Sequence, residues 1–123
     1  MSIFRLSVKA IGCKNGADTM TQIDEEEHMR EKQIEQRLVK EVRSQGGICP
    51  KFVSPGMDGM PDRLVLLPGC QIGFVEVKAP GKPPRPLQTN RHRILRRLGF
   101  PVFILDDPEQ IPSIIGEVRS WRR

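Results

Sequence analysis

Apolar residues recur along the chain with two different periods. Ile34, Leu38 and Val42 recur every four residues, which is the spacing of one face of an amphipathic helix, and Gly46-Gly47 follows as its end. Shorter runs of β-branched and aromatic residues, bounded by glycine and proline, predict strands. The predicted order is helix, three strands, helix, strand, helix, with helices over 24–45, 87–98 and 108–119 and strands over 48–53, 63–67, 72–78 and 100–105.

The third predicted strand ends in charged residues. Side chains alternate between the two faces of a strand, so Val75 and Val77 share one face, while Glu76 and Lys78 share the other. A buried carboxylate is costly unless it is paired with a cation or holds a metal ion. This strand therefore carries candidate chemistry on one face and core residues on the other.

A turn brings a second carboxylate to the same place. Pro68-Gly69 separates the second and third predicted strands and favours a hairpin between them. Asp62 comes just before this hairpin, at its open end, and so is expected beside Glu76 and Lys78. Two carboxylates and a lysine at one strand end can hold a divalent metal ion and activate a water molecule.

Two helix positions add candidates, each with an alternative. Glu35 lies inside the apolar stripe of the first helix, with Glu31 one turn earlier, and either pairs with an arginine at the stripe edge or points into the same site. Gln88 lies in the first turn of the second helix and is either an exposed residue or a site residue. His92 is expected on the surface, because the predicted apolar face of that helix consists of Leu87, Ile94, Leu95 and Leu98.

Charge is concentrated in one segment. Residues 78–97 contain seven basic residues and no acidic one, in a chain of 123 residues whose net charge is +5. The rest of the chain is therefore mildly acidic, at −2. Five of the seven are arginines, which bind phosphate through two hydrogen bonds, so a nucleic acid is favoured over a merely solvated face.

Chain length and cysteine content argue against a membrane-spanning protein and against a zinc-binding protein. The length fits one small domain, and no apolar run is long enough to span a membrane. Three cysteines without Cys-x-x-Cys spacing indicate free thiols in a reducing compartment rather than a zinc site. We expect an N-terminal extension of unknown role over 1–23, a catalytic domain over 24–119 and a short tail over 120–123.

This arrangement resembles the PD-(D/E)xK nuclease core, in which Pro61-Asp62 and Glu76-Val77-Lys78 match the two motifs. The wider match over 51–56, 59–63, 74–79 and Pro86-Leu87-Gln88 is similar to the VRR-NUC branch. The resemblance covers about 27–118. It implies an α/β, restriction-endonuclease-like fold of order αβββαβ(α), with a small mixed central sheet flanked by helices.

The resemblance also implies a role for each matching residue. Asp62, Glu76 and the backbone carbonyl of Val77 would bind Mg²⁺ or Mn²⁺, and Glu35 would either lie behind these ligands or bind the metal through water. Lys78 would orient or deprotonate the attacking water, and Gln88 would position Lys78 or the scissile phosphate. Contacts to nucleic acid would come from six residues: Lys51, Ser54, Lys82, Arg85, Arg91 and Arg93.

Stand-alone members of this branch resemble homodimeric resolvases of four-way DNA junctions. We therefore expect a metal-dependent, structure-selective DNA endonuclease that acts as a homodimer on Holliday junctions in the cytoplasm of a bacterial or phage-infected cell. One alternative is a repair nuclease for flaps or nicks. Another is a non-catalytic DNA-binding module, in which Asp62, Glu76 and Lys78 form only a structural ion pair.

Overall fold

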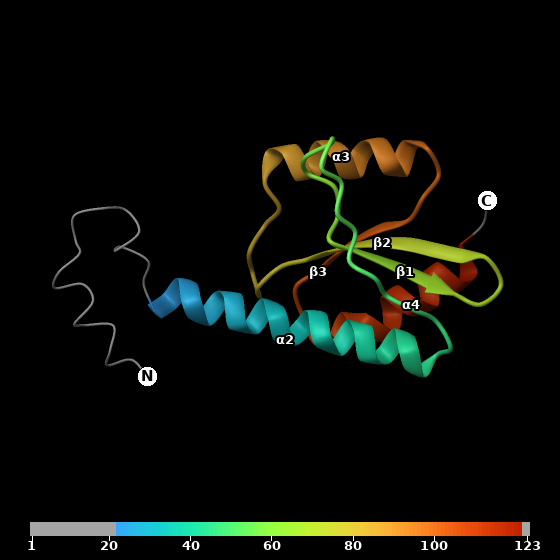
Figure 1. The fold of residues 1–123 in the computed structure, drawn as a ribbon, viewed down its shortest axis with the longest axis horizontal. Helices are drawn as coiled ribbons and strands as arrows, with labels where there is room; N and C mark the ends of the chain where they lie inside the picture. Colours follow the sequence, from blue (N-terminus) through green and yellow to red (C-terminus); the bar gives the residue numbers. More distant parts are fainter. Residues whose placement is uncertain (1–21, 122–123) are drawn as a thin grey trace, which may run out of the picture.

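The computed structural model describes residues 22–121 and shows one three-stranded sheet between helices (Figure 1). β2 is the central strand, antiparallel to β1 and parallel to β3. Helix α3 covers one face of the sheet, and α2 and α4 cover the other (Figure 1). The elements are α2 (Gln22–Ser44), β1 (Arg63–Leu67), β2 (Gln71–Val77), α3 (Pro86–Arg97), β3 (Val102–Leu105), η2 (Pro108–Gln110) and α4 (Ile111–Ser120).

The α/β architecture agrees with the sequence-based expectation, with small shifts at element ends. Helix α2 begins at Gln22, two residues before its expected start, and the rest of the N-terminal extension lies outside the described residues. The last helix begins as the short 3₁₀ turn η2, where Asp107 Oδ1 accepts a hydrogen bond of 3.0 Å from the Glu109 N–H. Of the described helices, none has the length and apolarity needed to cross a membrane.

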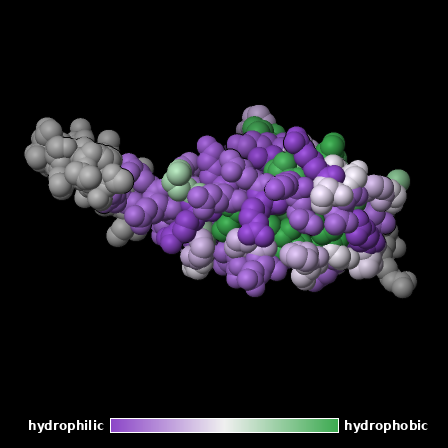
Figure 2. All heavy atoms as spheres, turned by 90° about the horizontal axis from the view of Figure 1, so that it is seen from below, coloured by the Kyte–Doolittle hydropathy of each residue, from purple (hydrophilic) through white to green (hydrophobic). Residues whose placement is uncertain are grey.

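The larger core lies between the sheet and helices α2 and α4. The predicted stripe of α2 is buried as expected, and Leu38 and Val42 have no exposed surface. Val75 and Val77 of β2 point into the same core, so the predicted alternation along this strand is confirmed. Seen from the side of α2, the outer surface is mostly hydrophilic, with small apolar areas between charged side chains (Figure 2).

The smaller core lies between the sheet and α3, and here the predicted helix face was wrong. Only Leu95 of the four apolar residues is buried; the other three are 39%, 40% and 69% exposed. The inward residues are instead Gln88, His92 and Leu95. Helix α3 therefore packs on the sheet through two polar side chains together with Leu95.

The first predicted strand, 48–53, was also wrong in part. This segment runs beside β1 but makes only isolated bridges, Ile48 with Leu66 and Lys51 with Arg63. Pro50 lies between the two bridges and has no N–H to donate, although its carbonyl accepts a hydrogen bond from the Leu64 N–H. A continuous ladder is therefore interrupted at the edge of the sheet.

Both described cysteines, Cys49 and Cys70, are free, as expected, whereas Cys13 lies outside the described residues. Cys49 is buried, and this burial raises the pKa of its thiol to about 11. Cys70 is exposed in the turn between β1 and β2.

Candidate active site

The predicted hairpin of β1 and β2 is confirmed, and it brings Asp62 to the end of β2. The strands pair in a register that places Arg63 opposite Val75. Asp62, one residue before β1, accepts a hydrogen bond of 3.0 Å at Oδ2 from the Val77 N–H. The Asp62 carboxylate is thereby fixed beside the segment that carries Glu76 and Lys78.

Glu76 is the most enclosed acid of the site, with 1% of its surface exposed. Its Oε2 accepts a hydrogen bond of 2.7 Å from Gln88 Nε2 and lies 3.5 Å from the ammonium of Lys78. Its Oε1 lies 3.7 Å from His92 Nε2, and neither of these two atoms has a hydrogen-bond partner. Strand β2 and helix α3 therefore both place polar groups around one carboxylate.

Gln88 is buried and oriented by the start of α3. The Arg85 N–H donates a hydrogen bond of 2.8 Å to Gln88 Oε1, so the amide NH₂ of Gln88 faces Glu76. This is one half of a capping box, in which the side chain at the third helical position satisfies a free backbone donor. The alternative of an ordinary exposed glutamine is thus wrong, because the helix cap itself directs Gln88 inward.

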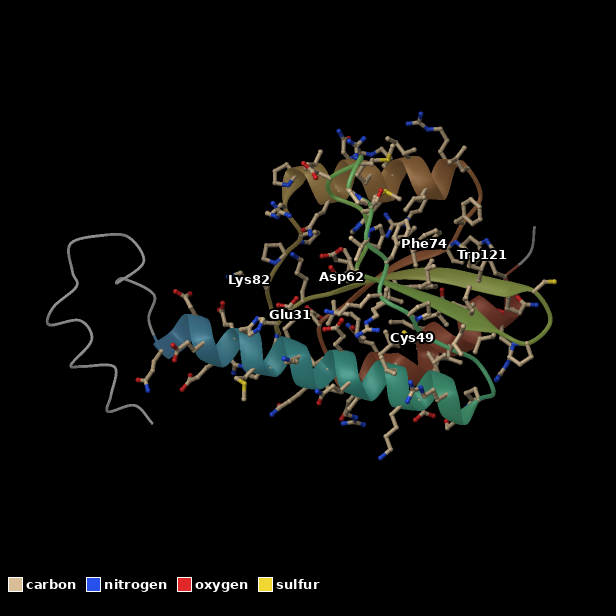
Figure 3. All side chains as sticks on the ribbon, viewed as in Figure 1. Glu31, Cys49, Asp62, Phe74, Lys82 and Trp121 are labelled. Carbon is tan, nitrogen blue, oxygen red and sulfur yellow. The ribbon has the colours of Figure 1, made fainter. Side chains whose placement is uncertain are left out.

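Negative charge accumulates at this end of the sheet. Burial, followed by the charge of Glu76, raises the pKa of Asp62 from its ordinary 3.8 to about 6, although the Val77 N–H acts in the opposite direction. Burial also raises the pKa of Glu31, which lies in the fields of Lys78 and Glu35. Glu31 on α2 and Asp62 lie near each other beside the sheet end (Figure 3).

Glu35, the acid that the sequence favoured on α2, makes a different contact. Its Oε2 accepts a hydrogen bond of 2.7 Å from Arg63 Nε, and Arg63 Nη1 donates to the Cys49 carbonyl at 2.8 Å. The first of the two alternatives for Glu35, an arginine pair, is therefore observed. Glu31, one turn earlier, is not among the predicted site residues, but it lies in the fields of Lys78 and Glu76.

The site has two carboxylates suited to a divalent metal ion, although residues 22–121 contain no group of three or more His, Cys, Asp or Glu side chains placed to hold one. Three features fit a hard dication such as Mg²⁺ or Mn²⁺. The ligands are oxygens, Glu76 Oε1 is buried without a partner, and the charge of Glu76 contributes to the raised pKa of Asp62. Mg²⁺ keeps several of its own waters, so two carboxylates are enough.

This chain is similar to known proteins in sequence and in fold. A protein named "Putative nuclease p44", from Acyrthosiphon pisum secondary endosymbiont phage 1, is 52% identical over 90 residues, which are 73% of this chain and 96% of that protein. A solved structure described as a VRR_NUC domain is 31% identical, with a TM-score of 0.66, and the match covers 71% of this chain and 95% of that structure. No family model matches the chain.

The chain belongs to the VRR-NUC family of nucleases. The sequence resemblance is thereby confirmed, and the pair of Asp62 and Glu76 lies where its two motifs meet.

The residues expected to contact nucleic acid in this VRR-NUC chain divide into two groups. Lys51, Arg85 and Arg93 are exposed, and Lys82 is exposed but pairs with Glu27 at 3.0 Å. In contrast, two of the six are partly buried. Arg91 donates from Nε to the Asp58 carbonyl at 2.8 Å, and the Ser54 carbonyl accepts a hydrogen bond from the Met57 N–H. Arg91 therefore ties α3 to the loop before Asp62.

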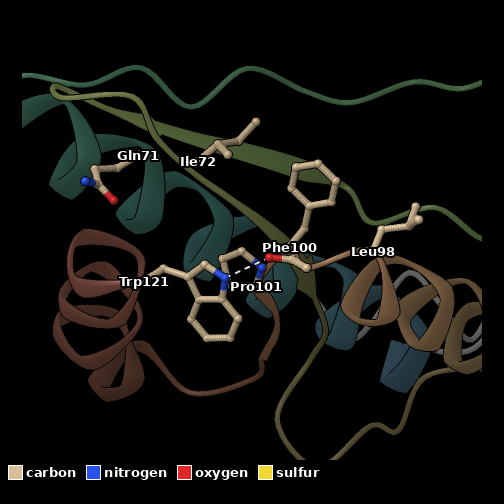
Figure 4. Close-up of a pocket in the computed structure, with 7 residues that line it drawn as sticks. Gln71, Ile72, Leu98, Phe100, Pro101 and Trp121 are labelled. Carbon is tan, nitrogen blue, oxygen red and sulfur yellow. Dashed lines mark hydrogen bonds between the residues drawn. The ribbon is translucent and has the colours of Figure 1, made fainter. Parts of the chain in front are cut away.

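An apolar pocket of about 270 Å³ lies away from these acids, near the end of the chain (Figure 4). At its rim, the Trp121 indole N–H donates a hydrogen bond of 2.8 Å to the Gly99 carbonyl. No acidic residue lines the pocket, so it has no groups for hydrolysis. The lining residues are Gln71, Ile72, Leu98, Gly99, Phe100, Pro101 and Trp121.

Proposed function

We propose that this VRR-NUC nuclease is a metal-dependent, structure-selective DNA endonuclease that acts as a homodimer on four-way junctions. The observation that carries the proposal is the convergence of Asp62, Glu76 and Lys78 at one end of the β1–β2 hairpin. A bound Mg²⁺ or Mn²⁺ would acidify a water molecule and offset charge on the scissile phosphate. Asp62, Glu76 and the Val77 carbonyl would hold it, whereas Glu35 is engaged by Arg63.

Lys78 supplies the positive charge of the proposed reaction. Its side chain is 14% exposed and its ammonium lies 3.5 Å from Glu76 Oε2, so the amine is held beside the Glu76 carboxylate. In that position it orients the attacking water and stabilises the negative charge that develops on the phosphate. Gln88, which is fixed by the Arg85 N–H, holds Glu76 beside it.

Cleavage of a labelled four-way junction tests the assignment. We expect Asp62→Ala and Lys78→Ala to reduce the rate by at least about a thousandfold with Mg²⁺, while binding of the junction changes by less than about threefold. Lys40→Ala removes an exposed cation from the outside of α2 and serves as the control. Cleavage at the wild-type rate in either site variant would refute its role.

A panel of substrates separates the possible activities. Junction, flap, nicked duplex, fork and linear duplex are compared at equal concentration with and without divalent metal. Preferred cleavage of the junction supports resolution, whereas preferred cleavage of flaps or nicks identifies a repair nuclease. If no substrate is cut and calorimetry detects no uptake of Mn²⁺, the chain is a DNA-binding module whose acids and lysine form an ion pair.

The homodimer proposal follows from the need to cut two strands with one site per chain. Helix α3 also exposes apolar side chains that its own fold leaves uncovered, Ile94 at 40% and Leu98 at 69%. Light scattering of the purified protein tests the stoichiometry, and a monomeric mass at micromolar concentration would contradict it. The phage relative further supports action in the cytoplasm of an infected cell.

A further inference from the structure

His92 is a polar residue in a place where helix α3 was expected to be apolar. It is 1% exposed, although α3 leaves Leu87 and Ile94 at 39% and 40% exposure. Burying an imidazole while exposing aliphatic side chains is unfavourable unless the buried ring gains a polar partner. The interior around His92 must therefore offer such a partner.

The partner that the structure offers is Glu76. His92 follows Gln88 by four residues, so both side chains leave the same face of α3. Gln88 Nε2 donates to Glu76 Oε2 at 2.7 Å, and His92 Nε2 faces Glu76 Oε1 at 3.7 Å. Helix α3 thus presents one nitrogen to each oxygen of the same carboxylate.

The two facing atoms, His92 Nε2 and Glu76 Oε1, are buried and otherwise unpartnered. Buried polar atoms without partners are rare and costly, so a donor and an acceptor that face each other are expected to pair. A movement of roughly 0.7 Å would bring the two atoms to hydrogen-bond distance. A neutral imidazole with its proton on Nε2 is sufficient as the donor.

We propose that His92 is a positioning residue, which donates from Nε2 to Glu76 Oε1 and, with Gln88, fixes the Glu76 carboxylate for the metal ion. A carboxylate oxygen has two lone pairs, so Oε1 can accept from His92 and still bind the ion. The inference rests on the proposed function, because orientation of Glu76 matters for catalysis only if this carboxylate binds the ion. His92 itself touches neither substrate nor metal. It acts through Glu76, in the way that partners behind metal ligands hold those ligands in place.

Two substitutions at His92 separate the hydrogen bond from packing. His92→Gln keeps an N–H donor near the position of Nε2, whereas His92→Met has a similar volume and no donor. Binding of Mn²⁺ is measured by calorimetry without DNA, and metal-free unfolding in urea confirms that each variant folds. The other histidine of the chain, His28, is exposed. His28→Met therefore controls for the general loss of an imidazole that could bind metal.

We expect the dissociation constant for Mn²⁺ to rise about tenfold in His92→Met and to stay within about threefold of wild type in His92→Gln and His28→Met. Equal affinity in His92→Met and wild type would overturn the inference, as would equally weak binding in both His92 variants. Wild-type protein that takes up no Mn²⁺ would overturn the proposed function and, with it, this inference.

A measurement on the unsubstituted protein covers the case in which His92→Met does not fold. In ¹⁵N NMR spectra, the His92 ring should carry its proton on Nε2, and that proton should exchange slowly with water. Its chemical shift should move in Glu76→Gln and stay unchanged in Lys40→Ala, which lies on the outside of α2. A ring without a protected Nε2 proton would overturn the inference.

Discussion

At the scale of single residues, the site places carboxylates where their charge is unfavourable until a cation arrives. Asp62 is the clearest case, because burial and Glu76 raise its pKa to about 6. The hydrogen bond that its carboxylate accepts from the Val77 N–H lowers the pKa and so only partly compensates. An ionised carboxylate at position 62 therefore lowers the stability of the metal-free protein, and a neutral side chain of the same shape would raise it.

This argument predicts that Asp62→Asn stabilises the metal-free protein. Because the folded pKa of about 6 exceeds the ordinary 3.8, ionised Asp62 is disfavoured in the folded state. That cost is absent below about pH 4, grows through pH 6 and is complete above about pH 7. Asp62 is partly exposed, so solvent screening leaves a gain on the order of 1 kcal/mol at pH 8.

Urea unfolding in EDTA between pH 4 and pH 8 measures this effect. The difference between Asp62→Asn and wild type should vanish near pH 4. Added Mn²⁺ should stabilise the wild type and have little effect on Asp62→Asn, because only the wild type keeps both carboxylates. A variant that is less stable than wild type at pH 8 without metal would show that Asp62 has a structural role.

The two acids of α2 should respond to neutralisation with opposite signs. Glu35→Gln leaves the partly buried Arg63 without its charged partner, so we expect a loss of about 1 to 2 kcal/mol in the free energy of unfolding. Glu31→Gln removes a carboxyl group whose pKa is raised by burial, so stability should stay equal or increase. Urea unfolding at pH 7.5 compares them, and equal losses would refute the distinction.

At the scale of elements, the loop before Asp62 and the start of α3 hold each other in place. Gly59 has a φ of +86°, and a Cβ at this position would lie 2.9 Å from Leu87 Cγ and 3.0 Å from the Leu87 carbonyl oxygen. Arg91 adds its hydrogen bond to the Asp58 carbonyl. The contact is therefore close enough for a side chain at position 59 to displace the helix that carries Gln88.

Gly59→Ala should consequently reduce both stability and cleavage. We expect a loss of about 1 to 3 kcal/mol from the left-handed backbone and the clash with Leu87. Gly56→Ala, in the same loop, is the matched control, because its Cβ would meet nothing within 4 Å. Thermal unfolding and junction cleavage of both variants test this, and equal behaviour of the two would show that the contact does not matter.

The same elements show how far sequence reasoning could go. The stripe of α2 and the alternation of β2 were predictable, because each repeats with the period of its own backbone and meets a core. The inward face of α3 did not follow from the apolar pattern, since Gln88 and His92 are buried by their contacts with Glu76 on another element. Only the family resemblance placed Gln88 at the site. In the segment 48–53, the apolar residues predicted a strand. The missing N–H of Pro50 interrupts its pairing with β1, so only isolated bridges form.

At the scale of the whole molecule, acidic residues are concentrated at the start of α2 and basic residues along α3. The first turn of α2 is acidic, with Asp24 and Glu25, whereas α3 has no acid in its first turn and ends in Arg96-Arg97. Asp62 lies at the sheet end between these two helices (Figure 3). A polyanion such as DNA is therefore attracted to the α3 side. The carboxylates at the sheet end attract a cation instead.

This separation predicts which cations set the salt dependence of DNA binding. If Arg85 and Arg93, both exposed at or on α3, each neutralise one phosphate, the double variant Arg85→Ala/Arg93→Ala should flatten the plot of log K against log salt concentration by about 1.8, or about 0.9 per contact. Lys32→Ala/Lys40→Ala removes the same charge from the exposed face of α2 and should change the slope little. Fluorescence anisotropy with a labelled four-way junction, without divalent metal, gives both slopes. Equal slopes in the two double variants would mean that net charge, and not the α3 surface, attracts the DNA.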